Sequence, residues 1–242
     1  KLMTMIAALE DQVIDTLQMI DTENGELDFY GFKVRDSKKG GYGKINAMDI
    51  FRLSSNTGMV KIITDAYDGK SEKFVNRLYN MGINNPIDLG IKGEPNPKIP
   101  HPSENDWNGL SLPWMSYGYG ILLTPLQILS FYNGIANNGE MVKPTFLEST
   151  SKLGSTNFYE FKKEIINPSI CSKKTLSIVQ KMLLDVIHHK NGTAKNIKSQ
   201  HIKIAGKTGT AQIGYGTDEI NYISSFVGYF PADQPKYSCI VV

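Results

Sequence analysis

With 242 residues, of which 40% are hydrophobic and 21% charged, the chain is long enough to bury a sizeable core in one large domain or two lobes. Its net charge of +2 comes without a dense basic stripe, and arginine is confined to Arg35, Arg52 and Arg77, so the composition argues against a nucleic-acid-binding protein. No run of about 18 apolar residues and no signal peptide is present. Because the chain also opens on Lys1 rather than Met, we expect it to be a piece of a longer protein.

Cysteine and histidine are too scattered to indicate a metal site. Cys171 and Cys239 are isolated, and none of the histidines lies at ligand spacing from a cysteine or carboxylate. We predict no metal and no cofactor, and whether the two cysteines pair stays open.

The first third of the chain predicts helices interrupted by one irregular region. Residues 1–14 are apolar nearly all round through Leu9, which is typical of a helix buried on most sides. Residues 22–45 carry glycine and asparagine clusters between short alternating runs and predict hairpin-like structure. Short helices are then expected over 47–53, 58–66 and 72–81.

The middle of the chain begins with a proline-rich stretch over 84–118, which we interpret as a long ordered loop in which Tyr117 and Tyr119 serve as turn and packing residues. A helix follows, with Thr124 as N-cap, Pro125 in the first turn and Gly139 just past its end. Residues 148–160 are polar and turn-rich, and Ser172 is the N-cap of the last long helix.

Strand patterns are confined to the C-terminal part, over 200–212, 221–230 and 237–242. In the first of them Ile202 and Ile204 alternate with polar residues, which predicts one buried face. Because helices come first and a sheet last, the pattern favours an α+β fold.

We expect the functional site around residues 201–212, His-Ile-Lys-Ile-Ala-Gly-Lys-Thr-Gly-Thr-Ala-Gln. A glycine inside a strand often marks the close approach of another backbone or a ligand. Lys207 supplies a cation there, and Thr208 and Thr210 supply hydroxyls, a set that suits an anionic, peptide-like ligand. The alternative is an ordinary edge strand with one solvated lysine.

Several short motifs occur in one order and together resemble the transpeptidase domain of class B penicillin-binding proteins, the cell-division type most closely. That resemblance covers the whole chain. It implies an α+β fold of the penicillin-binding protein/serine β-lactamase type, with an antiparallel sheet flanked by helices (166–242) and a mainly helical lobe (1–165). The motifs are Ser54-Ser-Asn-Thr-Gly-Met59, Ser116-Tyr-Gly-Tyr-Gly120, Thr124-Pro-Leu-Gln127, Ala136-Asn-Asn-Gly139, Gly192-Thr-Ala194, Ala205-Gly-Lys-Thr-Gly-Thr-Ala-Gln212 and Phe226-Val-Gly-Tyr-Phe-Pro231.

The resemblance also implies residue roles. The family's nucleophilic serine stands three residues before a lysine that opens an apolar helix; Lys1 matches that lysine, so the serine is expected before residue 1. Lys1 would be the base, Ser54 would relay a proton to the leaving amine, and Asn56 would hold the substrate amide.

On the strand, Lys207, Thr208 and Thr210 would bind the carboxylate of a D-Ala-D-Ala stem peptide or of a β-lactam. Gly209 would let the peptide lie along the strand, and the Thr210 N–H would be one oxyanion donor. The implied partners are peptidoglycan stem peptides, β-lactam antibiotics and, through the parent protein, other cell-wall synthesis and division proteins. The implied location is the periplasmic face of the inner membrane, with an N-terminal membrane anchor outside this chain.

A rival assignment exists in the polar stretch, where Ser149-Thr-Ser-Lys152 and Ser155-Thr-Asn157 fit the same short patterns. These two lie almost side by side, with no buried helix after the serine, whereas the chemistry needs motifs that converge from separate elements.

Two other functions stay open: a serine β-lactamase or β-lactam-sensing receptor, and a non-catalytic scaffold. Without the nucleophile, we expect residues 1–242 alone to be inactive.

Overall fold

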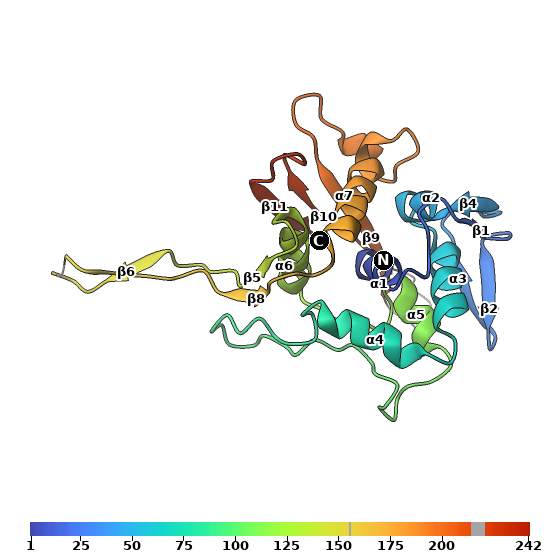
Figure 1. The fold of residues 1–242 in the computed structure, drawn as a ribbon, viewed down its shortest axis with the longest axis horizontal. Coiled ribbons are helices and arrows are strands. Elements are labelled where there is room, and N and C mark those ends of the chain that lie inside the picture. Colours follow the sequence, from blue (N-terminus) through green and yellow to red (C-terminus); the bar gives the residue numbers. More distant parts are fainter. Residues whose placement is uncertain (155, 214–220) are drawn as a thin grey trace.

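Helix α1 (Leu2–Glu10) lies at the centre of the molecule in the computed structural model, which describes residues 1–154, 156–213 and 221–242 (Figure 1). Its apolar residues point to almost every side and are buried, as the sequence pattern predicts. Three helices pack on it: α3 (Asn56–Tyr67), α4 (Ser71–Asn80) and α7 (Lys173–His188). The hydrophobic core is therefore built around the helix that Lys1 precedes.

Two small antiparallel sheets lie beside this helical body. Strand β1 (Met19–Asp21) pairs with β4 (Lys44–Asn46), which leads into the short helix α2 (Ala47–Arg52). Strands β2 (Glu26–Phe29) and β3 (Phe32–Arg35) form the hairpin that the alternating run in this region predicts. Hairpin β2–β3 ends close to the start of α3.

The proline-rich stretch is more ordered than the sequence suggests. Residues 111–117 form helix α5 (Ser111–Tyr117), so the interpretation of 84–118 as a loop is wrong there. Pro113 lies in the first turn of this helix, where the missing N–H would have no intrahelical partner anyway. The helix ends at Gly118, which adopts a left-handed conformation with φ of 108°.

Helix α6 (Pro125–Ala136) begins at Thr124 as predicted and is followed by an arm that projects from the body (Figure 1). At the base of the arm β5 (Met141–Val142) pairs with β8 (Ile165–Asn167). Further out, the polar stretch forms a hairpin of β6 (Ser149–Ser151) and β7 (Phe158–Glu160), whose residues are exposed.

The C-terminal sheet is antiparallel, in the order β11–β10–β9, with β9 (Ala205–Ile213) at one edge, β10 (Asn221–Phe230) in the middle and β11 (Tyr237–Val241) at the other edge. Helix α7 packs against β9, and α6 packs against β10 and β11. The strand expected from residue 200 begins only at Ala205, and Ile202 is 44% exposed, so the predicted buried face at 201–204 is wrong. A short 3₁₀ turn, Lys195–Ile197, joins α7 to this region.

Helices around an antiparallel sheet confirm the α+β class. The division at residue 165 stays a prediction, because α6 from the first part packs on strands of the second. Cys171 and Cys239 are free thiols, the first buried and the second exposed.

Candidate active site

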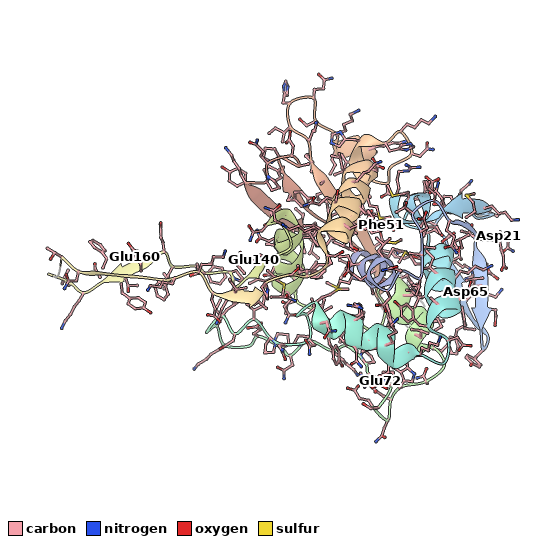
Figure 2. The ribbon with its side chains drawn as sticks, viewed as in Figure 1. Asp21, Phe51, Asp65, Glu72, Glu140 and Glu160 are labelled. Carbon is pink, nitrogen blue, oxygen red and sulfur yellow. The ribbon has the colours of Figure 1, made fainter. Side chains whose placement is uncertain are left out.

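Two lysines from opposite ends of the chain meet near the middle of the molecule. Lys207 on β9 is only 4% exposed, and its Nζ lies 5.9 Å from the centre of the Phe51 ring. Figure 2 labels Phe51 on α2, next to α1. The Lys207 ammonium donates a hydrogen bond to the backbone oxygen of Thr208 at 3.1 Å. Lys1, at the N-cap of α1, lies over the Tyr117 ring at 5.8 Å.

Burial makes both lysines weaker bases than lysines in water. It lowers the pKa of Lys1 from 10.5 to about 8, against a smaller opposing effect of the Asp36 carboxylate. Burial, and then the positive charge of Lys1, lowers the pKa of Lys207 well below 10.5. A lysine with a pKa of about 8 is neutral in roughly one molecule in ten at pH 7, which suits it to accept a proton.

The Ser54–Asn56 turn joins α2 to α3 in an unusual backbone conformation. Ser54 has φ of 56°, in the left-handed region, which costs a non-glycine residue ~1–3 kcal/mol unless its surroundings hold it. Ser55 is the N-cap of α3, and its Oγ accepts from the Gly58 N–H at 3.0 Å. Asn56 donates from its side-chain nitrogen to the Arg35 carbonyl at 2.7 Å.

Residues of β9 present the other wall of the site. Thr208 is partly buried and Thr210 is exposed. The Thr208 hydroxyl lies 3.1 Å from the hydroxyl of Thr193, in the turn after α7. A Cβ built at Gly209 would lie 2.5 Å from the Ser225 Oγ on β10. The glycine therefore leaves room for the Ser225 hydroxyl.

Asp36 links the Ser54–Asn56 turn with Lys1. Its carboxylate accepts hydrogen bonds from Ser55, Asn56 and Thr57, and its charge acts on Lys1. The structure thus brings together Lys1, the Ser54–Asn56 turn and Lys207. The sequence gives no local signal for Asp36, because it lies 19 residues before Ser55 and meets it only in the fold.

Helix α5 brings two tyrosines to the same region. The Tyr117 ring lies beneath the Lys1 ammonium, and the Tyr119 hydroxyl accepts from the Gln212 N–H at 3.1 Å. The sequence predicts turn and packing roles for both tyrosines and carries no signal for these contacts. Thr193, in the Gly192-Thr-Ala194 motif, was likewise not expected beside Thr208.

The rival assignment lies elsewhere. Ser149 is in β6 and Lys152 follows it, both exposed on the projecting arm, where Figure 2 labels Glu160. Ser155 of the rival triplet lies outside the described residues.

Among the residues that are described, no His, Cys, Asp and Glu group is placed to hold a metal ion. The helices in the described ranges include none with the length and hydropathy to span a lipid bilayer.

Partly buried Lys1 and buried Lys207 thus lie together beside the Ser54–Asn56 turn, and comparison with known proteins gives the family of the chain. The family model described as the penicillin binding protein transpeptidase domain matches residues 1–242. The chain belongs to this family.

Curated relatives align over almost the whole chain. It is 28% identical to penicillin-binding protein PbpB of Mycolicibacterium smegmatis, with 98% of this chain and 37% of the relative covered. It is 27% identical to peptidoglycan D,D-transpeptidase FtsI of Buchnera aphidicola, covering 100% of this chain and 39% of that one. The chain thus spans less than two fifths of these relatives' length.

Solved structures agree on the fold. The transpeptidase domain of Burkholderia pseudomallei penicillin-binding protein 3 superposes with a TM-score of 0.78 at 25% identity, over 97% of this chain and 66% of the other. Penicillin-binding protein 3 of Mycobacterium tuberculosis in complex with aztreonam superposes with a TM-score of 0.82 at 24% identity, over 98% of this chain and 53% of the other.

Proposed function

We propose that residues 1–242 form the greater part of a D,D-transpeptidase domain, which cross-links peptidoglycan stem peptides by serine acyl transfer and is a target of β-lactams. The observation that carries this proposal is the pairing of partly buried Lys1 with buried Lys207, each with a lowered pKa. A lysine base needs such a pKa, and removal of Lys1 from water provides it. The family membership and the D,D-transpeptidase named among the relatives support the same reaction class.

The first half of the proposed reaction forms an ester. The nucleophile is a serine three residues before Lys1, outside this chain. Neutral Lys1 takes the proton of that serine, whose oxygen attacks the carbonyl between the two D-alanines. The Thr210 N–H stabilises the oxyanion, a contribution worth about 10²–10³ in rate for one donor. The C–N bond then breaks, and Ser54 relays a proton to the leaving D-alanine.

The second half transfers the acyl group. The amine of a neighbouring stem peptide attacks the ester carbonyl and loses a proton to Lys1, which returns it to the serine oxygen as the C–O bond breaks. Asn56 holds the substrate amide throughout. The reaction leaves the number of peptide bonds unchanged, so it needs no cofactor.

The substrate carboxylate binds at Lys207, Thr208 and Thr210, with the peptide along β9 at Gly209. The arriving anion favours the charged form of Lys207, whose pKa burial and the charge of Lys1 lower. Such a carboxylate gains a charge-assisted hydrogen bond in a site shielded from water.

The substrate sets the location and the partners that we propose. Peptidoglycan lies outside the cytoplasm, so the domain works at the periplasmic face of the inner membrane, carried by a membrane-anchored parent protein. Other proteins of cell-wall synthesis and division are its proposed partners there.

Fluorescent penicillin tests this function in the full-length protein. We expect one covalent adduct per molecule, stable for the duration of the assay, and release of D-alanine from a D-Ala-D-Ala peptide when an acceptor amine is supplied. Rapid loss of the adduct with hydrolysed penicillin would indicate a β-lactamase. A stable adduct without D-alanine release would indicate a receptor, and no adduct at all would indicate a scaffold.

A further inference from the structure

The carboxylate of Asp36, which lies outside helix α3, accepts hydrogen bonds from the first residues of that helix. Its Oδ1 accepts from the backbone N–H groups of Asn56 at 2.6 Å and Thr57 at 3.1 Å. Its Oδ2 accepts from the Thr57 hydroxyl at 2.8 Å, and the Ser55 hydroxyl lies within 3.1 Å of both oxygens. The first N–H groups of a helix have no partner within it, and here one side chain of hairpin β2–β3 binds two of them.

Arg35, which precedes Asp36, holds the side chain of Asn56, whereas Asp36 binds the backbone N–H of that residue. The Arg35 carbonyl accepts from the Asn56 side-chain nitrogen at 2.7 Å. Because the nitrogen and oxygen of an amide point in diverging directions, this bond also sets the direction of the Asn56 Oδ1. Arg35, the last residue of β3, and Asp36, which follows it, thus hold both the side chain and the backbone of Asn56.

Ser54 depends on the same contacts. Its left-handed backbone, with φ of 56°, persists only where neighbouring residues are held. Ser55 and Thr57, which Asp36 binds, are both fully buried, so water cannot replace the carboxylate without repacking. Asp36 is also the charged group that acts on Lys1.

We propose that Asp36 is a positioning residue for acyl transfer: through Ser55, Asn56 and Thr57 it holds Ser54 and Asn56 in the arrangement that the reaction with Lys1 requires. This inference rests on the proposed function. It gives the β2–β3 hairpin a role in the rate of the reaction, although Asp36 itself does not touch the substrate.

The test measures penicillin acylation of the full-length protein by stopped flow, separating non-covalent binding from the acylation step. For Asp36→Ala we expect the acylation rate constant to fall about 100-fold, while the dissociation constant changes less than about threefold, because the carboxylate site on β9 is untouched. Asp36→Asn keeps an acceptor for the two N–H groups and should recover part of that loss. Thr57→Val, which removes one partner of the carboxylate, should fall between Asp36→Asn and the wild type.

Asp28→Ala is the matched control. Asp28 lies in the same hairpin, where its Oδ1 accepts from the Gly31 N–H at 2.9 Å, away from the Ser54–Asn56 turn. An equal loss of acylation in Asp28→Ala would overturn the proposal in favour of a general effect of hairpin stability. A folded Asp36→Ala variant that acylates within about twofold of wild type would also overturn it and leave the proposed function intact. Failure of the wild-type protein to acylate would overturn both.

If Asp36→Ala does not fold, the acylation rate constants of Asp36→Asn and Thr57→Val test the proposal instead. Both keep the volume of the replaced side chain, and unchanged acylation rate constants in both would contradict the proposal.

Discussion

Lys1 and Lys207 need opposite protonation states for the reaction that we propose. Lys1 acts when neutral, and Lys207 binds a carboxylate when charged. Both have lowered pKa values because both are withdrawn from water, and the charge of Lys1 lowers the pKa of Lys207 further. A carboxylate that neutralises the charge at Lys207 would leave Lys1 as the base, so substrate binding assigns the two roles.

The first prediction concerns pH. Because the pKa of Lys1 is lowered to about 8, its neutral fraction rises almost tenfold per pH unit below that value and levels off above it. The acylation rate constant of the full-length protein should follow the same curve. Fluorescent penicillin kinetics between about pH 6 and pH 10 provide the measurement, and a rate constant independent of pH across that range would contradict Lys1 as the base.

The second prediction concerns Lys207. Lys207→Ala removes the buried counter-charge for the carboxylate, a change that costs roughly 2 kcal/mol or more, or about 30-fold in acylation efficiency. Lys203→Ala is the control, because Lys203 is an exposed lysine just before β9. Equal effects of the two substitutions would mean that the carboxylate binds elsewhere.

Among the helices and strands, α6 has the clearest N-terminal capping motif. The Thr124 hydroxyl accepts from the Gln127 N–H at 3.1 Å, and the Gln127 side chain accepts from the Thr124 N–H at 2.8 Å. Because α6 packs on β10 and β11, loosening its first turn weakens support for the sheet that carries Lys207.

Thr124→Ala should therefore lower the free energy of unfolding by about 1 kcal/mol. Urea unfolding followed by circular dichroism gives that free energy. Thr150→Ala on the exposed strand β6 serves as the control and should change it by less than about 0.5 kcal/mol. A cap substitution no more costly than the control would show that the first turn of α6 is held by tertiary packing instead.

The elements also show which features could be predicted from the sequence. Helices α6 and α7 begin at the predicted residues because Thr124 and Ser172 act within one turn. Helix α5 is not predicted because the proline-rich stretch over 84–118 is typical of a loop, although Pro113 in the first turn is compatible with a helix. The alternation at 201–204 indicated a strand, but β10 pairs with β9 only from Ala205 onward.

At the scale of the molecule, the site is assembled by contacts that no local pattern encodes. The sequence motifs predict Lys1, Ser54, Asn56 and Lys207 as site residues, because each motif is short and has a recognisable composition. Asp36 has no such signature, and Thr193 lies in a motif that assigns it no role. Their partners lie 15 or more residues away in sequence, and only the packed fold brings them together.

The prediction at this scale concerns residues 1–242 expressed alone. With no serine three residues before Lys1, this polypeptide should not form a penicilloyl adduct, and any β-lactam binding should be weak and reduced by salt. Intact-mass spectrometry after long incubation with benzylpenicillin checks this. An adduct mapped to Ser149 would reverse the choice between the two serine–lysine assignments.

The projecting β6–β7 arm bears on how the chain would respond to a protease. Exposed hairpins away from the core are preferred cleavage sites, and no residue of β6 or β7 belongs to the hydrophobic core. A cut between the two strands would give an N-terminal piece with α1 to α6 and a C-terminal piece with α7 and the three-stranded sheet. Because α7 packs on α1 and α2, and α6 on β10, the two pieces would stay associated without a peptide bond between them. Lys1 and Lys207 would then lie on separate polypeptides of one intact site.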